Sequence, residues 1–495
     1  MVELFQDKVF RRVFLFFTVL VGGVWLFLKI ISFDQSAYGL DLFSNLQMTY
    51  TWLQGFEPLY EGRYGHHSLL HNFYFNMLLA PFTLIFGAYG LFIAHVLITL
   101  TACFLTLKMV WLHYPHLKWY TGWWLAVFFV GIYGYWLFEN IWYGFHIELL
   151  YPSLSLFFAI SLLVGKRWQQ ILAGLLLVLV KEDGAVLACA IHLFYLFIQF
   201  SLKKQSAAKA FSKATVVACG WAFVFALGMF WMYYLNHFQS LRTNKAFHYF
   251  FTEAKAELLP FVSTCLAQAF DLLIPVFCFI GLFFKWRYLL TVVILVLPLL
   301  AVGIISSMLY YPFFDHALAW CPRFAHYYGF LLAAMLMLLV GERFRFILLQ
   351  PNLKIAYLLC MVLFLFHQKD HLKRIRNYHV FEVAKNRIAE FIKPTANKNR
   401  DIVQKISKRV PHAKWVALPS AYYNFFHRHN FMSAESEYIG NGPPGSPDLL
   451  ILLHNQEQVD TMANYVDFRK YNSDTLADLL IYHKPSMHLN LKGLK

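Results

Sequence analysis

The sequence predicts an all-α polytopic membrane protein followed by a small C-terminal α/β domain, and two observations lead to this fold class. Of its 495 residues, 59% are hydrophobic and only 14% are charged, whereas soluble domains carry about 25% charged residues. Long apolar runs also stop near residue 367, and residues 368–495 contain none. We therefore divide the chain into a transmembrane domain, residues 1–367, and an extracytoplasmic α/β domain, residues 368–495.

Eleven apolar runs come close to the roughly 20 residues that cross about 30 Å of hydrocarbon. The first run follows Lys8, Arg11 and Arg12 without a small-residue cleavage site, so we expect an uncleaved first span rather than a signal peptide. The eleven predicted spans are residues 13–32, 89–111, 120–138, 149–164, 167–182, 184–203, 214–235, 261–284, 288–309, 327–341 and 353–367.

A further apolar segment, residues 69–86, decides the topology. If this segment does not cross the membrane, most Lys and Arg residues of the transmembrane domain fall in the loops of one side. Cytoplasmic loops hold the excess of Lys and Arg. We therefore expect residues 69–86 to form an interfacial or re-entrant helix on the outer side. The N-terminus is then cytoplasmic, and the C-terminal domain is extracytoplasmic.

Charge and cysteine usage exclude several classes of site. The formal net charge of +15 would suggest nucleic acid in a soluble protein. Here the basic residues of the transmembrane domain lie mostly in cytoplasmic loops, so we expect no nucleic-acid partner. The seven cysteines contain no Cys-x-x-Cys pair, and we expect neither a disulfide framework nor a zinc site. Acidic residues instead gather in the outer loops, which places any chemistry on the extracytoplasmic face.

The first outer loop, residues 33–68, is too long and too aromatic to be a simple connector. Leu42, Leu46 and Tyr50 recur at helical spacing, which predicts a short amphipathic helix at the membrane interface. This helix begins near Asp41 and ends by Gly55. Asp41 is either a helix N-cap or a reactive carboxylate, and one residue can have both roles.

Histidines and carboxylates mark the next outer segments. His71 follows two other histidines, at a spacing that matches no zinc motif, and an isolated histidine is more often structural. His146 and Glu148 lie between two spans. Ionisable groups at membrane depth are functional by default, and the alternative for this pair is simple solvation in a short loop.

A charged triplet, residues 181–183, interrupts what would otherwise be one long apolar run. Turns form easily from Gly, Asn and Ser, so Lys181, Glu182 and Asp183 favour a functional role. A later aromatic loop holds Arg323 and, at its end, His326. A guanidinium binds phosphate bidentately, although Arg323 can also serve as an interfacial anchor. A substrate with a phosphate head and a lipid tail would suit these outer segments.

The order of these motifs resembles a bacterial family of multi-spanning membrane proteins of unknown function, which is itself similar to the GT-C class of membrane glycosyltransferases. The resemblance covers about residues 33–200. The matching residues are Asp41-Leu42 with Gly55-Phe56-Glu57-Pro58-Leu59-Tyr60, His71 with Ala80-Pro81, Phe145-His146-Ile147-Glu148, and Val180-Lys181-Glu182-Asp183.

This resemblance implies a GT-C-like glycosyltransferase of the bacterial inner membrane that moves a sugar from a polyprenyl-phosphate donor to an envelope acceptor. Asp41, with His146 and Glu148, would be catalytic, and Lys181 or Arg323 would bind the phosphate. His71, Glu182, Asp183 and His326 would support them. The family's second acidic loop residue is missing here, where residues 44–46 are Ser, Asn and Leu. This departure argues against a two-carboxylate metal site, although the participation of a divalent cation stays open.

Two other interpretations compete with the enzyme. A transporter or flippase for a lipid-linked saccharide would show internal repeats and charges at the bilayer midplane, and we find neither in the sequence. A non-catalytic envelope-assembly protein is expected if the outer carboxylates do not converge. In the C-terminal domain we predict strands at Trp415–Leu418 and Leu449–Leu453. That domain is either a structural cap or an acceptor-recognition unit.

Overall fold

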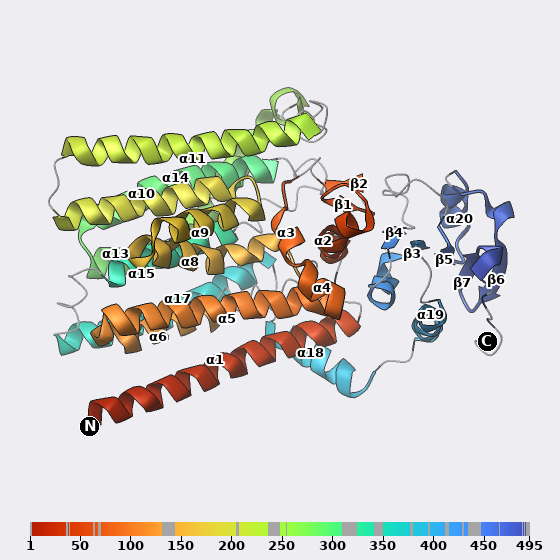
Figure 1. The fold of residues 1–495 in the computed structure, drawn as a ribbon, viewed down its shortest axis with the longest axis horizontal. Helices are drawn as coiled ribbons and strands as arrows, with labels where there is room; N and C mark the ends of the chain where they lie inside the picture. Colours follow the sequence, from red (N-terminus) through yellow and green to blue (C-terminus); the bar gives the residue numbers. More distant parts are fainter. Residues whose placement is uncertain are drawn as a thin grey trace.

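The computed structural model is a long helical bundle with a small mixed sheet beyond one of its ends (Figure 1). It describes residues 2–35, 38, 40–62, 65–67, 71–130, 144–203, 207–235, 248–253, 255–308, 324–340, 350–376, 380–394, 397–410, 415–427, 430–433, 447–464, 466–487, 489 and 491. Arg323 lies outside these residues, so its predicted role is not addressed by the structure.

The bundle consists of long helices that run side by side, and each of the eleven predicted spans falls largely on one of them. The central helix is α8, Tyr151–Val164, which is buried along most of its length against α15 and neighbouring helices. The other bundle helices are α1 Val2–Asp34, α5 Ala88–His113, α6 Lys118–Val130, α9 Arg167–Val180, α10 Gly184–Lys203, α11 Ala207–Leu235, α13 Lys255–Phe283, α14 Trp286–Met308, α15 Phe324–Leu339 and α17 Pro351–Arg376. A 3-10 turn, η3 Pro115–Leu117, connects α5 to α6, and a π-helical turn, η5 Tyr249–Glu253, precedes α13.

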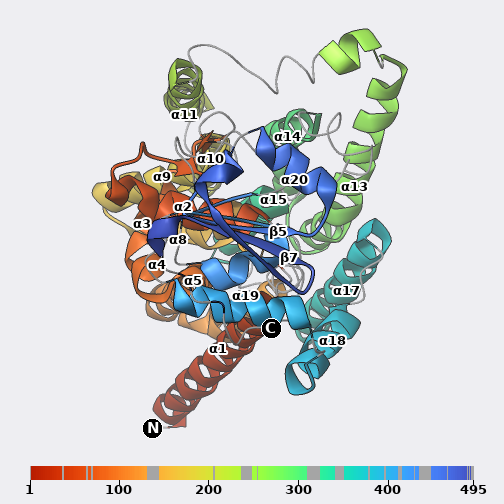
Figure 2. The same ribbon diagram turned by 90° about the vertical axis from the view of Figure 1, so that its right-hand side faces the viewer.

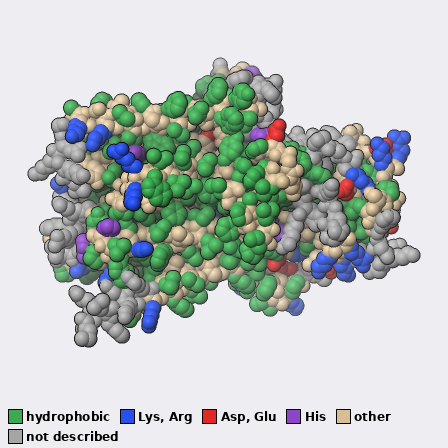
Figure 3. Space-filling model, in the orientation of Figure 1, with side chains coloured by type: hydrophobic (Ala, Val, Ile, Leu, Met, Phe, Trp, Pro, Cys, Tyr) green, Lys and Arg blue, Asp and Glu red, His purple; other side chains and the backbone are tan. Residues whose placement is uncertain are grey.

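Among the described residues, six helices are long and apolar enough to cross a membrane, and four further apolar helices are shorter. On the face drawn in Figure 3, hydrophobic side chains cover the length of the bundle, and basic side chains lie toward its end far from the sheet and on the C-terminal domain. The chain is therefore a multi-pass membrane protein. We call the end of the bundle next to the sheet the outer end; the count of eleven spans and the orientation in the cell stay predictions.

The first outer loop forms the predicted helix, with different surroundings from those expected. Helix α2, Leu40–Tyr50, continues into the 3-10 turn η1, Thr51–Gln54, which ends at Gly55. Asp41 lies in the first turn of α2, where a carboxylate is favoured by the free backbone N–H groups of the helix start. Residues 42–50 are all buried, because other segments cover this helix on several sides. It is therefore not a surface helix with one exposed face.

After the hairpin of β1, Tyr60–Glu61, and β2, Gly65–His66, the segment 69–86 contains two short helices instead of one. They are α3, Phe75–Leu78, and α4, Ala80–Phe86. Pro81 lies in the first turn of α4, where its missing N–H costs little. Seven helical residues rise only about 10 Å, so neither helix reaches across a bilayer.

The C-terminal domain is built on a five-stranded sheet of order β4-β3-β5-β7-β6. Both predicted strands are present, as β3 Trp415–Leu418 and β5 Leu449–Leu453, and they pair in parallel. The remaining strands are β4 Asn430–Ser433, β6 Asn472–Leu476 and β7 Leu479–His483. The accompanying helices and 3-10 turns are α18 Val380–Ile392, α19 Lys398–Arg409, η7 Ser420–Phe426, α20 Gln456–Ala463, η8 Phe468–Lys470 and η9 Pro485–Met487.

The C-terminal domain packs on the outer end of the bundle, as the end-on view also shows (Figure 2). The ring of Tyr423 meets Phe43 of α2 edge-on at 5.1 Å. The Nδ1 atom of His427 accepts a hydrogen bond from the backbone N–H of Ala88, at the start of α5. These contacts explain why α2 is buried, since the domain covers the side of α2 that faces away from the bundle.

Candidate active site

The charged triplet after α9 is the centre of a buried polar cluster at the outer end of the bundle. Helix α9 ends at Val180, and Lys181 is extended, with its side chain 1% exposed. Its ammonium lies 2.6 Å from a carboxylate oxygen of Glu148 and 3.3 Å from one of Asp183. Glu148 comes from the 3-10 turn η4, Ile147–Leu150, just before α8. Lys181 therefore joins two buried carboxylates from different parts of the chain.

The turn that carries the triplet depends on a glycine. A Cβ atom on Gly184 would lie 2.0 Å from the backbone oxygen of Leu177, closer than any real contact. Only glycine allows α10 to start this near the end of α9. The close approach holds residues 181–183 between the two helices, where each charged side chain reaches a different neighbour.

Glu182 points toward the segment that follows the first outer loop. One carboxylate oxygen lies 2.9 Å from His71 Nδ1, and the other accepts the backbone N–H of Asn72 at 3.1 Å. Burial raises the pKa of Glu182 to about 7, against the opposing effect of the adjacent Lys181 ammonium. Glu182 therefore takes up a proton close to neutral pH, beside the His71 imidazole.

Asp183 points toward the core of the bundle. The hydroxyl of Tyr151 donates to one of its oxygens at 2.6 Å, and His326 Nε2 lies 3.0 Å from the same oxygen. Burial alone would raise the pKa of Asp183, but His326 and Lys181 hold it well below its usual range. Asp183 is therefore ionised and links α8, α10 and α15.

His146 lies where the buried cluster meets the first outer loop. Its Nδ1 atom is 3.8 Å from Glu148 Oε2, and its ring meets Phe73 edge-on at 5.5 Å. Burial lowers the pKa of His146, while the nearby carboxylates of Glu148 and Asp41 partly oppose this effect. Neutral imidazole is the form that accepts a proton. Asp41 itself is half-buried in the first turn of α2.

The turn before His146 is held by a buried lysine of α1. Lys29 is 1% exposed, and its ammonium donates a hydrogen bond to the carbonyl oxygen of Gly144. The same ammonium lies 5.3 Å from the centre of the Phe92 ring, within the range of a cation–π contact. Lys29 therefore fixes the backbone two residues before His146.

Sequence reasoning missed a second buried carboxylate near α2. Glu61 of β1 is 1% exposed and accepts a hydrogen bond from Ser44 Oγ at 3.0 Å. Its other oxygen lies 3.5 Å from His67 Nδ1. Nothing in the sequence distinguishes Glu61 from other acids of the outer loops, because the β1–β2 hairpin that turns it inward carries no strong pattern.

Four histidines of the cluster each lie within 4 Å of one carboxylate. The pairs are His67–Glu61, His71–Glu182, His146–Glu148 and His326–Asp183. Each of these buried carboxylates therefore has an imidazole beside it, and Glu148 and Asp183 also contact the Lys181 ammonium.

The structure thus brings together all the described residues that the sequence predicted for the site. Direct contacts join Glu148, Lys181 and Asp183, with His326 on Asp183, His71 on Glu182 and His146 beside Glu148, while Asp41 lies within electrostatic reach of His146. In the described part of the chain, no group of three or more His, Cys, Asp or Glu side chains is arranged to hold a metal ion.

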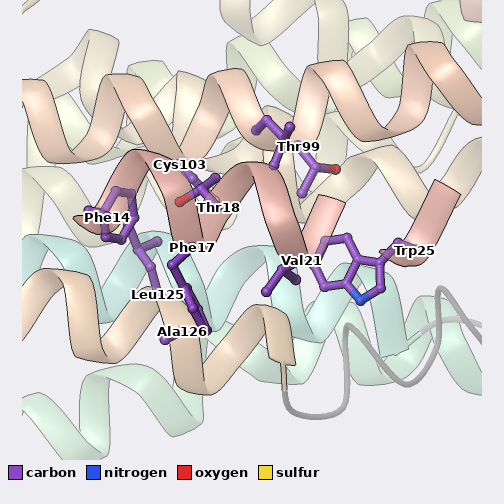
Figure 4. Close-up of a pocket in the computed structure, with 10 residues that line it drawn as sticks. Phe14, Phe17, Thr18, Val21, Trp25, Thr99, Cys103, Leu125 and Ala126 are labelled. Atoms are coloured by element: carbon purple, nitrogen blue, oxygen red, sulfur yellow. The ribbon is translucent and has the colours of Figure 1, made fainter. Parts of the chain in front are cut away.

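A separate small cavity lies beside α1, on the N-terminal side of Lys29. It has a volume of about 30 Å³. Figure 4 shows its apolar lining, which includes Phe14, Val21 and Trp25 of α1, with Thr99 and Leu125 from neighbouring helices. Because this lining is almost wholly apolar, the cavity offers no groups that would bind a polar sugar or its phosphate.

The structural neighbours of the chain include two crystal structures of ArnT from Cupriavidus metallidurans, one bound to undecaprenyl phosphate and one in the apo state. Each is 11% identical and covers 96% of this chain and 99% of ArnT, with TM-scores of 0.44 and 0.42. ArnT is a GT-C glycosyltransferase, the class that the sequence motifs resemble. No protein-family model and no curated protein matches the chain. Because both TM-scores are below 0.5, this likeness gives no support to a function. Support for the function comes from the side chains of this chain.

Proposed function

We propose that the chain is a membrane glycosyltransferase that moves a sugar from a polyprenyl-phosphate donor to an envelope acceptor at the outer end of the bundle. The observation that carries the proposal is the position of Asp41. This half-buried carboxylate lies at the edge of a buried network of carboxylates and imidazoles, within electrostatic reach of His146. A membrane-embedded bundle gives a lipid-linked donor access to that edge.

In the proposed reaction, Asp41 acts as the general base. It removes the proton of an acceptor hydroxyl while the hydroxyl oxygen attacks the anomeric carbon of the sugar. The bond between that carbon and the phosphate oxygen breaks, and the polyprenyl phosphate leaves with the electron pair. His146 is neutral because burial lowers its pKa, and it interacts electrostatically with Asp41. Its imidazole therefore supplies a second site for the proton.

Lys181 is the proposed cation for the leaving phosphate, and its contacts add a condition. Glu148 and Asp183 already occupy its ammonium, so a phosphate would replace one of them. Glu148 is the one that has another partner available, because its second oxygen faces His146 at 3.8 Å. We propose that donor binding shifts Glu148 toward His146 and frees Lys181 for the phosphate. Asp183, held by Tyr151 and His326, stays in place.

The proposal is tested by incubating the purified protein in nanodiscs with a panel of polyprenyl-phosphate sugars carrying a radioactive sugar, together with an envelope lipid extract. We expect transfer of label to an acceptor with at least one donor. Movement of donor across the bilayer without transfer would instead support the transporter. If neither process occurs with any donor, the non-catalytic assembly role is favoured and the proposal fails.

A further inference from the structure

Helix α18, at the start of the C-terminal domain, exposes large apolar side chains on one face. Ile388, Phe391 and Ile392 follow helical i, i+3, i+4 spacing and are 39%, 53% and 75% exposed. Asn386 is also exposed, and by the same spacing it lies on the opposite face of the helix. This amphipathic helix is therefore not fully covered by the described part of the chain.

Two contacts fix the position of α18 beside the outer part of α1. The ring of Phe391 meets that of Phe27 edge-on at 5.7 Å. The side-chain amide of Gln35, just after α1, donates a hydrogen bond to the carbonyl oxygen of Arg387 at 2.7 Å. Figure 1 shows α18 next to the outer end of α1. The apolar face of α18 thus contacts a side chain that belongs to a candidate membrane span.

The exposed surface of α1 around Phe27 indicates which surroundings cover the apolar face of α18. Phe27 lies in the candidate span Arg12–Asp34 and is itself 45% exposed. The surroundings of such a side chain are lipid. Phe27 precedes the end of the span by seven residues, which corresponds to about 10 Å along the helix. Amphipathic interfacial helices bury their apolar faces about 5–10 Å into the boundary between headgroups and acyl chains.

We propose that α18 is an interfacial helix, and that Ile388 and Ile392 insert into the same membrane leaflet that surrounds the outer half of α1. The apolar surface is continuous from Phe27 through Phe391 to these two side chains, so the lipid that covers the first part also covers the second. Lys385 and Lys393 are exposed on α18 or directly after it. Their ammonium groups can reach lipid phosphates while their stems stay near the apolar zone.

This contact gives the C-terminal domain a second attachment besides its packing on α2. Helix α18 is followed within a few residues by α19, whose Ile402, Val403 and Ile406 are buried in the core of the domain. A lipid-bound α18 therefore restrains the domain close to the membrane surface. The inference does not depend on the proposed transferase activity.

The test is photocrosslinking of full-length protein in nanodiscs of phosphatidylethanolamine and phosphatidylglycerol. The photoreactive residue p-benzoylphenylalanine replaces Ile392 or, in a second variant, Ile388. Asn386 is the matched control on the opposite face of α18, and Phe16 of α1, which is 70% exposed within a span, is the positive control. Adducts are identified by mass spectrometry after monodispersity has been checked for each variant.

We expect lipid adducts at positions 392 and 388 to exceed those at 386 several-fold and to approach the yield at 16. Equal yields at 392, 388 and 386 would overturn the proposal, because α18 would then lie in water. Crosslinks from 392 to another copy of the chain would also overturn it, because a second copy would then be what covers this face.

Discussion

Replacing Lys181 by methionine removes the buried ammonium that joins Glu148 and Asp183. The substitution keeps a similar side-chain length and removes the ammonium that lies 2.6 Å from Glu148, whose other carboxylate oxygen is 3.8 Å from His146. Removing one partner of a buried ion pair costs about 3–5 kcal/mol, because the remaining charge stays buried without compensation. Asp183 keeps Tyr151 and His326, so most of the cost comes from Glu148. We expect Lys181→Met to lower the free energy of unfolding by about 3 kcal/mol, the lower end of that range.

The assay is unfolding in mixed micelles of mild detergent and increasing dodecyl sulfate, followed by tryptophan fluorescence. A double variant, Lys181→Met with Glu148→Gln, removes both charges and should recover more than half of the loss. Lys484 and Asp448 form the matched control pair, since their charged atoms are 2.7 Å apart, against 2.6 Å for Lys181 and Glu148, but their side chains are 36% and 22% exposed. Lys484→Met should cost at most about 1 kcal/mol. Equal costs for Lys181→Met and Lys484→Met would refute the reasoning.

Two further predictions concern the same turn. Because folding raises the pKa of Glu182 from its ordinary value of 4.5 to about 7, the folded protein binds this proton more tightly, and stability should fall by about 3 kcal/mol as pH rises from 4.5 to 7. Glu182→Gln should remove that decline, as judged by melting temperatures at pH 5 and pH 8, whereas the same substitution at exposed Glu57 should leave the pH dependence unchanged. Gly184→Ala should lower the melting temperature sharply, because its Cβ would meet the backbone at 2.0 Å. Gly23→Ala, with nothing within 4 Å, should not, and similar melting temperatures for the two alanine variants would contradict the close approach.

Much of the helical architecture could be predicted because apolar runs of spanning length leave few alternatives. The two central strands of the C-terminal domain were also predicted, since short β-branched and leucine-rich runs stand between turn residues. The charged triplet was recognised because Lys181, Glu182 and Asp183 interrupt an apolar run, and their contacts with three separate segments explain why a simple turn sequence does not occur there.

Other features depend on contacts between distant segments, which a single sequence does not reveal. The burial of α2 requires the C-terminal domain, more than 350 residues later, to cover it through Tyr423. Glu61 joins the cluster because a two-residue hairpin turns it toward Ser44. The break between α3 and α4 was missed because the significance of Pro81 as a helix start was not recognised.

The central claim is that Asp41 is the base of a sugar transfer, and the most direct measurement compares Asp41→Asn with Asp34→Asn. Asp34 is an exposed outer carboxylate at the end of α1 that accepts a hydrogen bond from Tyr89, so it matches the charge change outside the cluster. With saturating polyprenyl-phosphate sugar, we expect kcat of Asp41→Asn to fall about 10²–10⁴-fold, with donor binding unchanged and Asp34→Asn close to wild type. Wild-type kcat in Asp41→Asn would contradict the assignment of Asp41 as the base.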